Sequence, residues 1–287
     1  MRRGQCVGRQ ARASRKRAAL SEGIDIVEAG IRAALARDCA GPLVVGLCGP
    51  QASGKSTMVA GLRTRFEVDG IRTAILGLDD IYLSSEVREQ LAANVHSLLR
   101  TRGVPGTHDV ALGEAVLDGL GRSGETVMPR FDKARDNPHP RAEWRPVTGP
   151  MDVVLFEGWC VGAQPQTDAA LIEPVNALER ERDPDGTWRR YVNARLAGDY
   201  ACLFARIGYL VLLAPPDFAT VVEWRKQPER EFAAELARAP RPGARAMSDA
   251  EVEAFVAHYE RLTCHILDEM PARADVVVRL DRHRRAI

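Results

Sequence analysis

The stretch Gly49-Pro-Gln-Ala-Ser-Gly-Lys55-Ser56 fits the pattern G-x-x-x-x-G-K-[ST] at every fixed position. The apolar run Leu43–Cys48 before it predicts a buried strand, and residues 55–68 after it predict a helix. A loop in this setting can turn its backbone N–H groups inward around a phosphate, beside the positive end of the helix. The pattern therefore predicts a phosphate-binding loop rather than a glycine-rich turn with a solvated lysine.

The residue types in this loop predict ATP and Mg²⁺ as cofactors. Lys55 is expected to reach the β- and γ-phosphates, and the Ser56 hydroxyl to hold the metal ion. Nine residues are expected to contact the nucleotide: Gly49, Pro50, Gln51, Ala52, Ser53, Gly54, Lys55, Ser56 and Thr57.

A second apolar run, Met151–Phe156, ends in the acid Glu157. An apolar strand ending in a carboxylate has the Walker B form, although Glu stands here in place of the commoner Asp. Beside a phosphate-binding loop, this acid is predicted to share the metal ion with Ser56. An exposed strand-end acid is the alternative.

The remaining patterns alternate between strands and helices, which predicts an α/β fold with a mostly parallel sheet covered on both faces. Further buried strands are expected at Thr73–Leu78, Asp152–Phe156, Tyr209–Ala214 and Asp275–Leu280, and helices at 24–35, 86–100, 109–121 and from a Ser248-x-x-Glu251 capping box onward. Residues 129–150 hold five prolines and are expected to be irregular.

Length and composition favour one globular domain over 21–287. Residues 1–20 carry seven basic residues and no acid, whereas the other 267 residues hold 33 basic and 39 acidic ones. A net-acidic body is a poor nucleic-acid surface, so the basic start is interpreted as a disordered tail, with an RNA-binding arm or a transit peptide as alternatives. No apolar stretch of 18 residues exists, which argues against a membrane span.

The six cysteines show neither a C-x-x-C pair nor zinc-site spacing, so we expect free thiols in a reducing cytoplasm. Cys48 and Cys160 are both expected beside the site. The sequence does not indicate whether they are redox-sensitive, and it does not indicate an oligomeric state.

Two acids, Asp79 and Asp80, follow the strand predicted at Thr73–Leu78, in the stretch Leu78-Asp-Asp-Ile-Tyr82. Ligands bind at the carboxyl ends of the strands in an open α/β sheet. An acid there can accept the proton of an acceptor hydroxyl as that hydroxyl attacks the γ-phosphate. A helix cap or an outer metal shell is the alternative for such a pair.

These motifs resemble the P-loop small-molecule kinases that include uridine kinase, phosphoribulokinase and bacterial pantothenate kinase. By that resemblance Asp79 is the catalytic base. Within the group the chain is most similar to the plant- and fungal-type D-glycerate 3-kinases and their bacterial relatives. The stretches that carry this resemblance are Leu78–Leu83, Arg102–Asp109, Pro129–Lys133, Phe156–Cys160, Val192–Leu196 and Val222–Arg225. The resemblance implies a three-layer P-loop fold with a helical lid.

An acceptor site for a small polyol acid is expected within an insertion at about 100–150. Cations that could bind its carboxylate are Arg102, His108, Arg130 and Lys133, and groups that could bind its hydroxyls are Asp109 and Asp132. Asp80 and Tyr82, before this insertion, are also expected to bind the acceptor. Each also has a structural alternative, since Asp109 could be a plain helix cap and Arg130 and Lys133 could pair with nearby acids.

Residues 216–247 are expected to form the lid, in a helix interrupted by Pro228. Arg225 on it could stabilise charge on the transferring phosphoryl group, and a solvated helix face is the alternative. The function expected is phosphoryl transfer from ATP to D-glycerate, giving 3-phosphoglycerate. Kinases for uridine, pantothenate or a sugar phosphate, and a P-loop ATPase regulatory module, are the alternatives.

Overall fold

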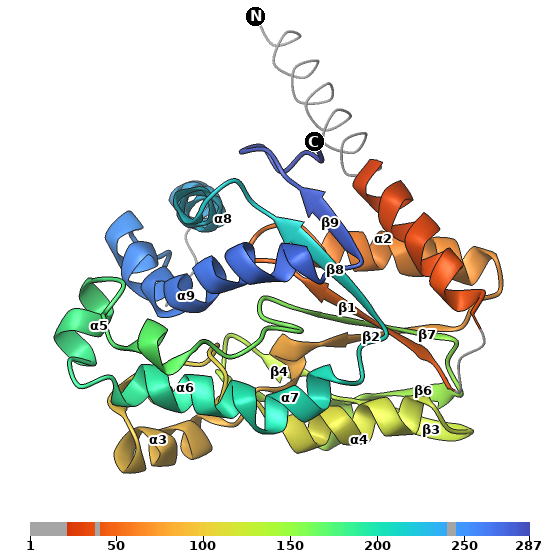
Figure 1. Ribbon diagram of the computed structural model, residues 1–287, viewed down its shortest axis with the longest axis horizontal. Coiled ribbons are helices and arrows are strands. Elements are labelled where there is room, and N and C mark those ends of the chain that lie inside the picture. Colours follow the sequence, from red (N-terminus) through yellow and green to blue (C-terminus); the bar gives the residue numbers. More distant parts are fainter. Residues whose placement is uncertain (1–21, 38–40, 240–244) are drawn as a thin grey trace, which may run out of the picture.

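A five-stranded parallel sheet in the order β2-β7-β1-β8-β9 forms the centre of the computed structural model, which describes residues 22–37, 41–239 and 245–287 (Figure 1). The strands are β1 (Leu43–Cys48), β2 (Thr73–Gly77), β7 (Val153–Gly158), β8 (Tyr209–Ala214) and β9 (Val276–Arg279). All five lie where the sequence predicts buried strands. The basic segment 1–20 lies outside the described residues.

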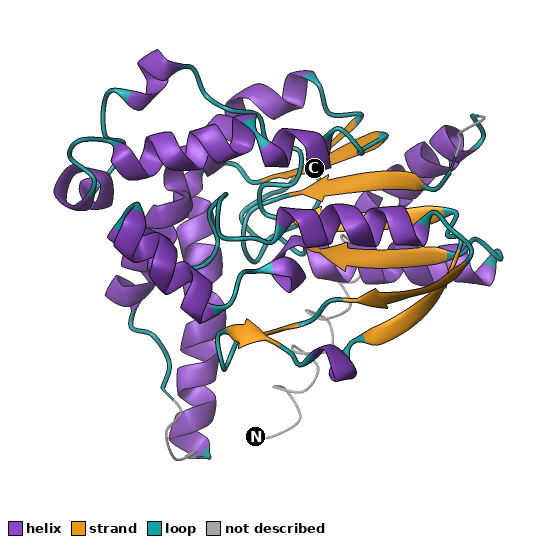
Figure 2. Ribbon diagram, turned by 90° about the horizontal axis from the view of Figure 1, so that it is seen from below, coloured by secondary structure: helices purple, strands orange, loops and turns teal. Residues whose placement is uncertain are grey.

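Successive residues of each central strand pack against opposite faces of the sheet. Val44, Phe156 and Leu212 belong to one apolar core, and their neighbours Val45 and Leu155 belong to the other. The first core is completed by α4 (Val110–Leu120), α7 (Asp199–Phe204) and α9 (Asp249–Glu269), and the second by helical residues 22–35 and α2 (Lys55–Val68). Figure 2 shows the helices on both sides of the strands. The predicted three-layer α/β/α fold is therefore confirmed.

The single helix predicted over 86–100 is wrong, because the chain forms two elements there. Helix α3 (Ser85–Asn94) ends at Val95, and a 3-10 turn, η2 (Ser97–Arg100), follows. His96 adopts an extended backbone, and its Nδ1 accepts a hydrogen bond from the Leu98 amide. The side chain of His96 thus offers the backbone an alternative to continued helix.

Residues 129–150 contain more regular structure than predicted. β3 (Gly124–Met128) pairs antiparallel with β6 (Arg145–Gly149), and β4 (Phe131–Asp132) pairs with β5 (Asn137–Pro138). The prolines misled the prediction because both strands of a two-stranded ribbon are edge strands, where proline is tolerated. The ribbon of β4 and β5 carries the loop that contains Lys133.

Helix α8 (Phe218–Arg238) continues through Pro228, so the predicted interruption is also wrong. Proline has no N–H to donate to the carbonyl four residues earlier, that of Trp224. Arg284 Nη2 donates to this carbonyl instead, at 3.1 Å. The capping box predicted at Ser248 is present and begins α9. Among the described residues, none of the helices is long and apolar enough to cross a membrane.

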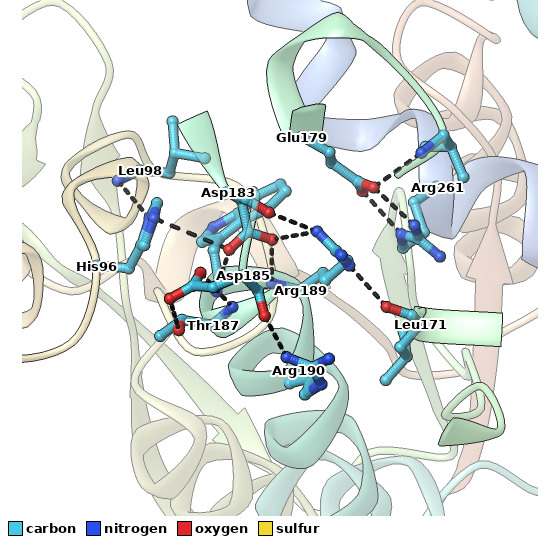
Figure 3. Close-up of polar contacts among 12 residues, drawn as sticks. His96, Leu98, Leu171, Glu179, Asp183, Asp185, Thr187, Arg189, Arg190 and Arg261 are labelled. Atoms are coloured by element: carbon cyan, nitrogen blue, oxygen red, sulfur yellow. Dashed lines mark hydrogen bonds and ion pairs between the residues drawn. The ribbon is translucent and has the colours of Figure 1, made fainter. Parts of the chain in front are cut away.

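One buried ion pair attaches the segment before α6 (Thr187–Ala197) to α9, and a second joins that segment to α6 (Figure 3). Arg261 on α9 binds both carboxylate oxygens of Glu179, at 2.7 and 2.6 Å, and donates to the carbonyl of Ala170. Glu179 lies on the short helix α5 (Ala177–Arg182), and Arg189 pairs with Asp183 at 3.0 Å. Because every charge here has a partner, the segment can be packed closely without exposing these groups to water.

The remaining 3-10 turns are η1 (Leu78–Ile81), η3 (Arg141–Glu143), η4 (Asp168–Leu171) and η5 (Met270–Ala272).

Removing Arg261 should therefore be costly. The variant Arg261→Met leaves the Glu179 carboxylate, whose side chain is 1% exposed, without its partner. We expect a loss of about 3–5 kcal/mol in the free energy of unfolding, measured by urea titration. Arg63→Met, which breaks an exposed pair with Glu67, should cost at most about 1 kcal/mol. Equal losses for the two variants would contradict this prediction.

Candidate active site

The carboxyl ends of β1, β2 and β7 open into a cleft of about 470 Å³. Eleven of the residues predicted from the sequence line it: Gln51, Ala52, Lys55, Ser56, Asp79, Asp80, Tyr82, Arg102, Lys133, Glu157 and Arg225. They come from six separate segments of the chain. The fold thus gathers the predicted phosphate loop, the strand-end acids and several cations around one space.

The phosphate loop has the backbone that its glycines allow. Gly54 caps α2 in a left-handed conformation, with φ 101°. A Cβ on Gly49 would lie 2.9 Å from the Cβ of Leu213 in β8, so the loop can approach the sheet only with glycine there. Lys55 Nζ donates to the carbonyl of Pro50 at 3.1 Å, across the mouth of the loop. The other predicted loop positions, Gly49, Pro50, Ser53, Gly54 and Thr57, do not line the cleft.

Ser56 and Glu157 meet at the edge shared by β1 and β7. Leu47 pairs with Glu157 in the parallel register, and the Ser56 hydroxyl donates to Glu157 Oε1 at 3.0 Å. A hydroxyl and a carboxylate are hard oxygen ligands of the kind that Mg²⁺ takes. The described residues contain no group of three or more His, Cys, Asp or Glu side chains that could enclose a metal ion. This donor set fits an ion that keeps waters and phosphate oxygens as its other ligands.

Asp79 lies at the end of β2 and is held from two sides. The Tyr82 hydroxyl donates to its Oδ1 at 2.7 Å, and Lys133 Nζ donates to its Oδ2 at 2.6 Å. Burial opposes ionisation of this carboxyl, but the Lys133 charge and the two hydrogen bonds outweigh that cost and lower the pKa of Asp79. Asp79 is therefore an ionised carboxylate that is able to accept a proton.

Asp80 has the opposite electrostatic character. Burial, followed by the neighbouring charge of Asp79, raises the pKa of Asp80 to about 6. Two adjacent carboxyls thus have pKa values moved in opposite directions, which is a recurrent feature of catalytic sites.

Two arginines line the cleft with fixed orientations. The Arg102 guanidinium lies over the Phe131 ring, 5.5 Å from its centroid, and pairs with Asp136. Arg225 on α8 lies 5.8 Å from the Phe255 ring centroid and pairs with Glu229 at 2.9 Å. Both therefore present a positive charge to the cleft from a packed position.

His108 does not line the cleft, although it was predicted to bind the acceptor. It is 2% exposed, its ring stacks on Tyr82 with centroids 4.5 Å apart, and its Nδ1 lies 2.6 Å from the Tyr200 hydroxyl. Burial lowers the pKa of His108 to about 3. A neutral, enclosed imidazole cannot supply the predicted positive charge, and its place is instead beneath the ring of Tyr82.

Three other predicted acceptor residues also lie outside the cleft lining. Asp109 caps α4, since its Oδ1 accepts from the Leu112 amide at 3.0 Å. Asp132 Oδ1 accepts two backbone amides of the following turn, and Arg130 Nη1 donates to the Glu143 carbonyl at 3.4 Å. Asp132 also pairs with the Arg135 side chain at 3.5 Å, so the contacts of these three residues are with the protein itself.

Aromatic residues that the sequence did not single out complete the cleft. Trp159, Phe255 and Tyr259 line it, and the rings of Trp159 and Tyr259 meet edge to face at 4.9 Å. The Tyr259 hydroxyl donates to the backbone carbonyl of Arg102 at 3.0 Å. Trp159 could have been predicted to lie at the site from the sequence, because it follows Glu157 by two residues. Phe255 and Tyr259 belong to the apolar face of α9 and look like ordinary core residues in the sequence.

The two cysteines near the site are buried. Burial raises the pKa of the Cys48 thiol to about 12 and raises that of Cys160 as well. Cys48 Sγ donates to the carbonyl of Trp159 at 3.3 Å. Thiols held in the protonated form are poor nucleophiles, so both act as packing groups.

Known proteins resemble this chain in sequence and in fold. An uncharacterized kinase of Schizosaccharomyces pombe is 32% identical over 227 residues, which cover 76% of this chain and 78% of that protein. The chloroplastic D-glycerate 3-kinase of Arabidopsis thaliana is 32% identical over 228 residues, which span 46% of its own length. The solved structure of D-glycerate 3-kinase from Cryptococcus neoformans has a TM-score of 0.75 at 25% identity, over 92% of this chain and 97% of that one. No protein-family model matches the chain.

The fold and the cleft define a P-loop phosphotransferase that acts on a hydroxyl group. The chain belongs to the family of ATP-dependent P-loop kinases that includes the plant and fungal D-glycerate 3-kinases.

The raised pKa of Asp80 predicts a pH-dependent cost to stability. Below its ordinary value of 3.8 the carboxyl is protonated in both states, and above about 6 it is ionised in both, at a cost in the folded state. Stability contributed by this group is therefore lost as pH rises from about 4 to 6. The free energy of unfolding of Asp80→Asn and of the unchanged protein can be measured by urea titration at pH 4 and at pH 8. The difference between the two proteins should move by about 2 kcal/mol in favour of the variant from pH 4 to pH 8. The same difference at both pH values would contradict it.

Proposed function

We propose that this kinase transfers the γ-phosphoryl group of ATP to a hydroxyl of D-glycerate, giving 3-phosphoglycerate. The observation that carries the proposal is the pair formed by Asp79 and Lys133, 2.6 Å apart in the cleft beside Lys55. A proton acceptor next to a cation suits a small molecule whose hydroxyl and carboxylate are separated by only a few bonds. A nucleoside or a pantothenate chain would not need a carboxylate-binding charge so near the base.

The nucleotide is bound by the loop Gly49–Thr57, with its backbone amides and Lys55 directed at the phosphates. Ser56 and Glu157 would hold Mg²⁺, which when bound neutralises phosphate charge and orients the nucleotide. Arg225 faces the cleft from α8, the helix we assign as the lid, and stabilises the charge on the group in transfer.

The acceptor is bound on the other side of the cleft. Lys133 and Arg102 attract its carboxylate, and the Asp79 carboxylate accepts the proton of the attacking hydroxyl. Tyr82 holds Asp79 in place through its 2.7 Å hydrogen bond, and Asp80 lies close enough to contact a second hydroxyl. The rings of Trp159 and Tyr259 limit the space available, which favours a short acceptor.

The relatives support this substrate. The Arabidopsis thaliana and Cryptococcus neoformans proteins are both named D-glycerate 3-kinase. The chain spans about half of the plant protein but almost all of the fungal structure, so the fungal protein is the better guide to an acceptor site.

Acceptor profiling tests the assignment directly. ADP release from ATP and Mg²⁺ should depend on added D-glycerate and should remain near the acceptor-free rate with uridine, pantothenate or a pentose phosphate. Turnover with one of those acceptors instead would replace the substrate. Slow hydrolysis that no acceptor stimulates would favour a regulatory ATPase.

Asp79→Asn removes the proposed base but keeps the shape of the side chain. We expect phosphoryl transfer to fall by about 10²–10⁴-fold while the affinity for ATP stays nearly unchanged, measured by coupled ADP assay and calorimetry. Asp118→Asn, a half-exposed acid on α4 that pairs with Arg206 and does not line the cleft, is the control and should keep full turnover. Loss of ATP binding in Asp79→Asn would assign the residue to the nucleotide instead.

A further inference from the structure

Arg284, in the turn after β9, joins the phosphate loop to α8 through one guanidinium group. Its Nε donates to the Ala52 carbonyl at 2.6 Å, its Nη1 to Gln227 Oε1 at 2.8 Å, and its Nη2 to the Trp224 carbonyl at 3.1 Å. The group also lies over the Trp224 ring, 5.1 Å from its centroid. The planar fork of arginine can make these three contacts at once, whereas a lysine ammonium lacks that geometry.

The loop end of this connection is a residue with an unusual backbone. Ala52 has φ 60°, in the left-handed region that residues other than glycine seldom adopt. Its carbonyl accepts from Arg284, and the residue itself lines the cleft. The charged hydrogen bond therefore helps to hold a part of the loop that its own backbone does not favour.

The helix end of this connection is the carbonyl that Pro228 leaves without an intrahelical donor. The guanidinium replaces the missing N–H at Trp224 and binds Gln227 on the next turn. Arg225 and Pro228, which flank this point, both line the cleft. Arg284 thus contacts the turn of α8 that presents Arg225.

The backbone conformation at position 284 does not favour an arginine. Arg284 has φ 63° in a turn whose amide bonds back to Asp281, a position where glycine or asparagine would be favoured. The side-chain contacts are therefore what hold the residue there.

We propose that Arg284 is a positioning residue for ATP, which aligns the phosphate loop with the turn of α8 that carries Arg225. The phosphate loop and this turn of α8 face the same end of the cleft from different parts of the chain, and the guanidinium fixes their relative position. This inference does not depend on the identity of the acceptor, since ATP binding can be measured without one.

The test compares Arg284→Met with Arg282→Met. Arg282 lies in the same turn, is 78% exposed and makes one ion pair at 4.0 Å, so it is a matched control. Calorimetric titration with ATP and Mg²⁺ should show about tenfold weaker binding for Arg284→Met and no comparable change for Arg282→Met. Arg284→Lys, which keeps the charge, should recover only part of the loss. Unchanged ATP affinity in a folded Arg284→Met protein would overturn the proposal.

A second substitution separates alignment of the loop from simple loss of helix stability. Pro228→Ala in the Arg284→Met protein restores an N–H for the Trp224 carbonyl but provides nothing for Ala52. We expect the double variant to regain resistance to urea and amide protection in α8 while ATP binding stays weak. Full recovery of ATP affinity along with stability would show that only the helix matters, and would overturn the role at the loop.

Discussion

The parallel register of β1, β7 and β2 is the constraint on which the site depends. Leu47 and Gly77 both pair with Glu157, so the three strands end at one edge. The phosphate loop follows β1, Glu157 is the next-to-last residue of β7, and Asp79 lies two residues after the end of β2. Hydrogen bonds along the strands fix these ends. The register of the sheet itself therefore brings the Ser56 hydroxyl and the acids to one edge.

Features encoded by neighbouring residues were readable from the sequence. The loop Gly49–Ser56 and the apolar runs on either side identify the fold, and Asp79 and Glu157 are recognisable because each follows a buried strand. The parallel rule then places these groups at one edge without knowledge of side-chain packing. Phosphate binding and the chemistry of the acids thus follow from short segments.

Features that depend on distant partners could not be predicted in the same way. The Asp79–Lys133 pair joins residues 54 positions apart, and Tyr259 lines the cleft from α9, where its ring meets that of Trp159. His108 has the residue type of a ligand, but burial removes its charge. Proline normally breaks a helix, but here Arg284, far from Pro228 in the sequence, donates the hydrogen bond that the Trp224 carbonyl would otherwise lack. In each case tertiary surroundings outweigh the local preference.

The contact between Arg284 and Ala52 spans 232 residues of chain. In the order of the sheet β8 pairs with β1 and β9 with β8, so these two strands bring the turn to the loop, and the contact can form only after both have joined the sheet. During synthesis at about 5–20 residues per second, the phosphate loop would leave the ribosome roughly 10–50 s before its partner. Nucleotide-binding geometry is thus completed only after Arg284 has been made, even though the motif that specifies it is made early.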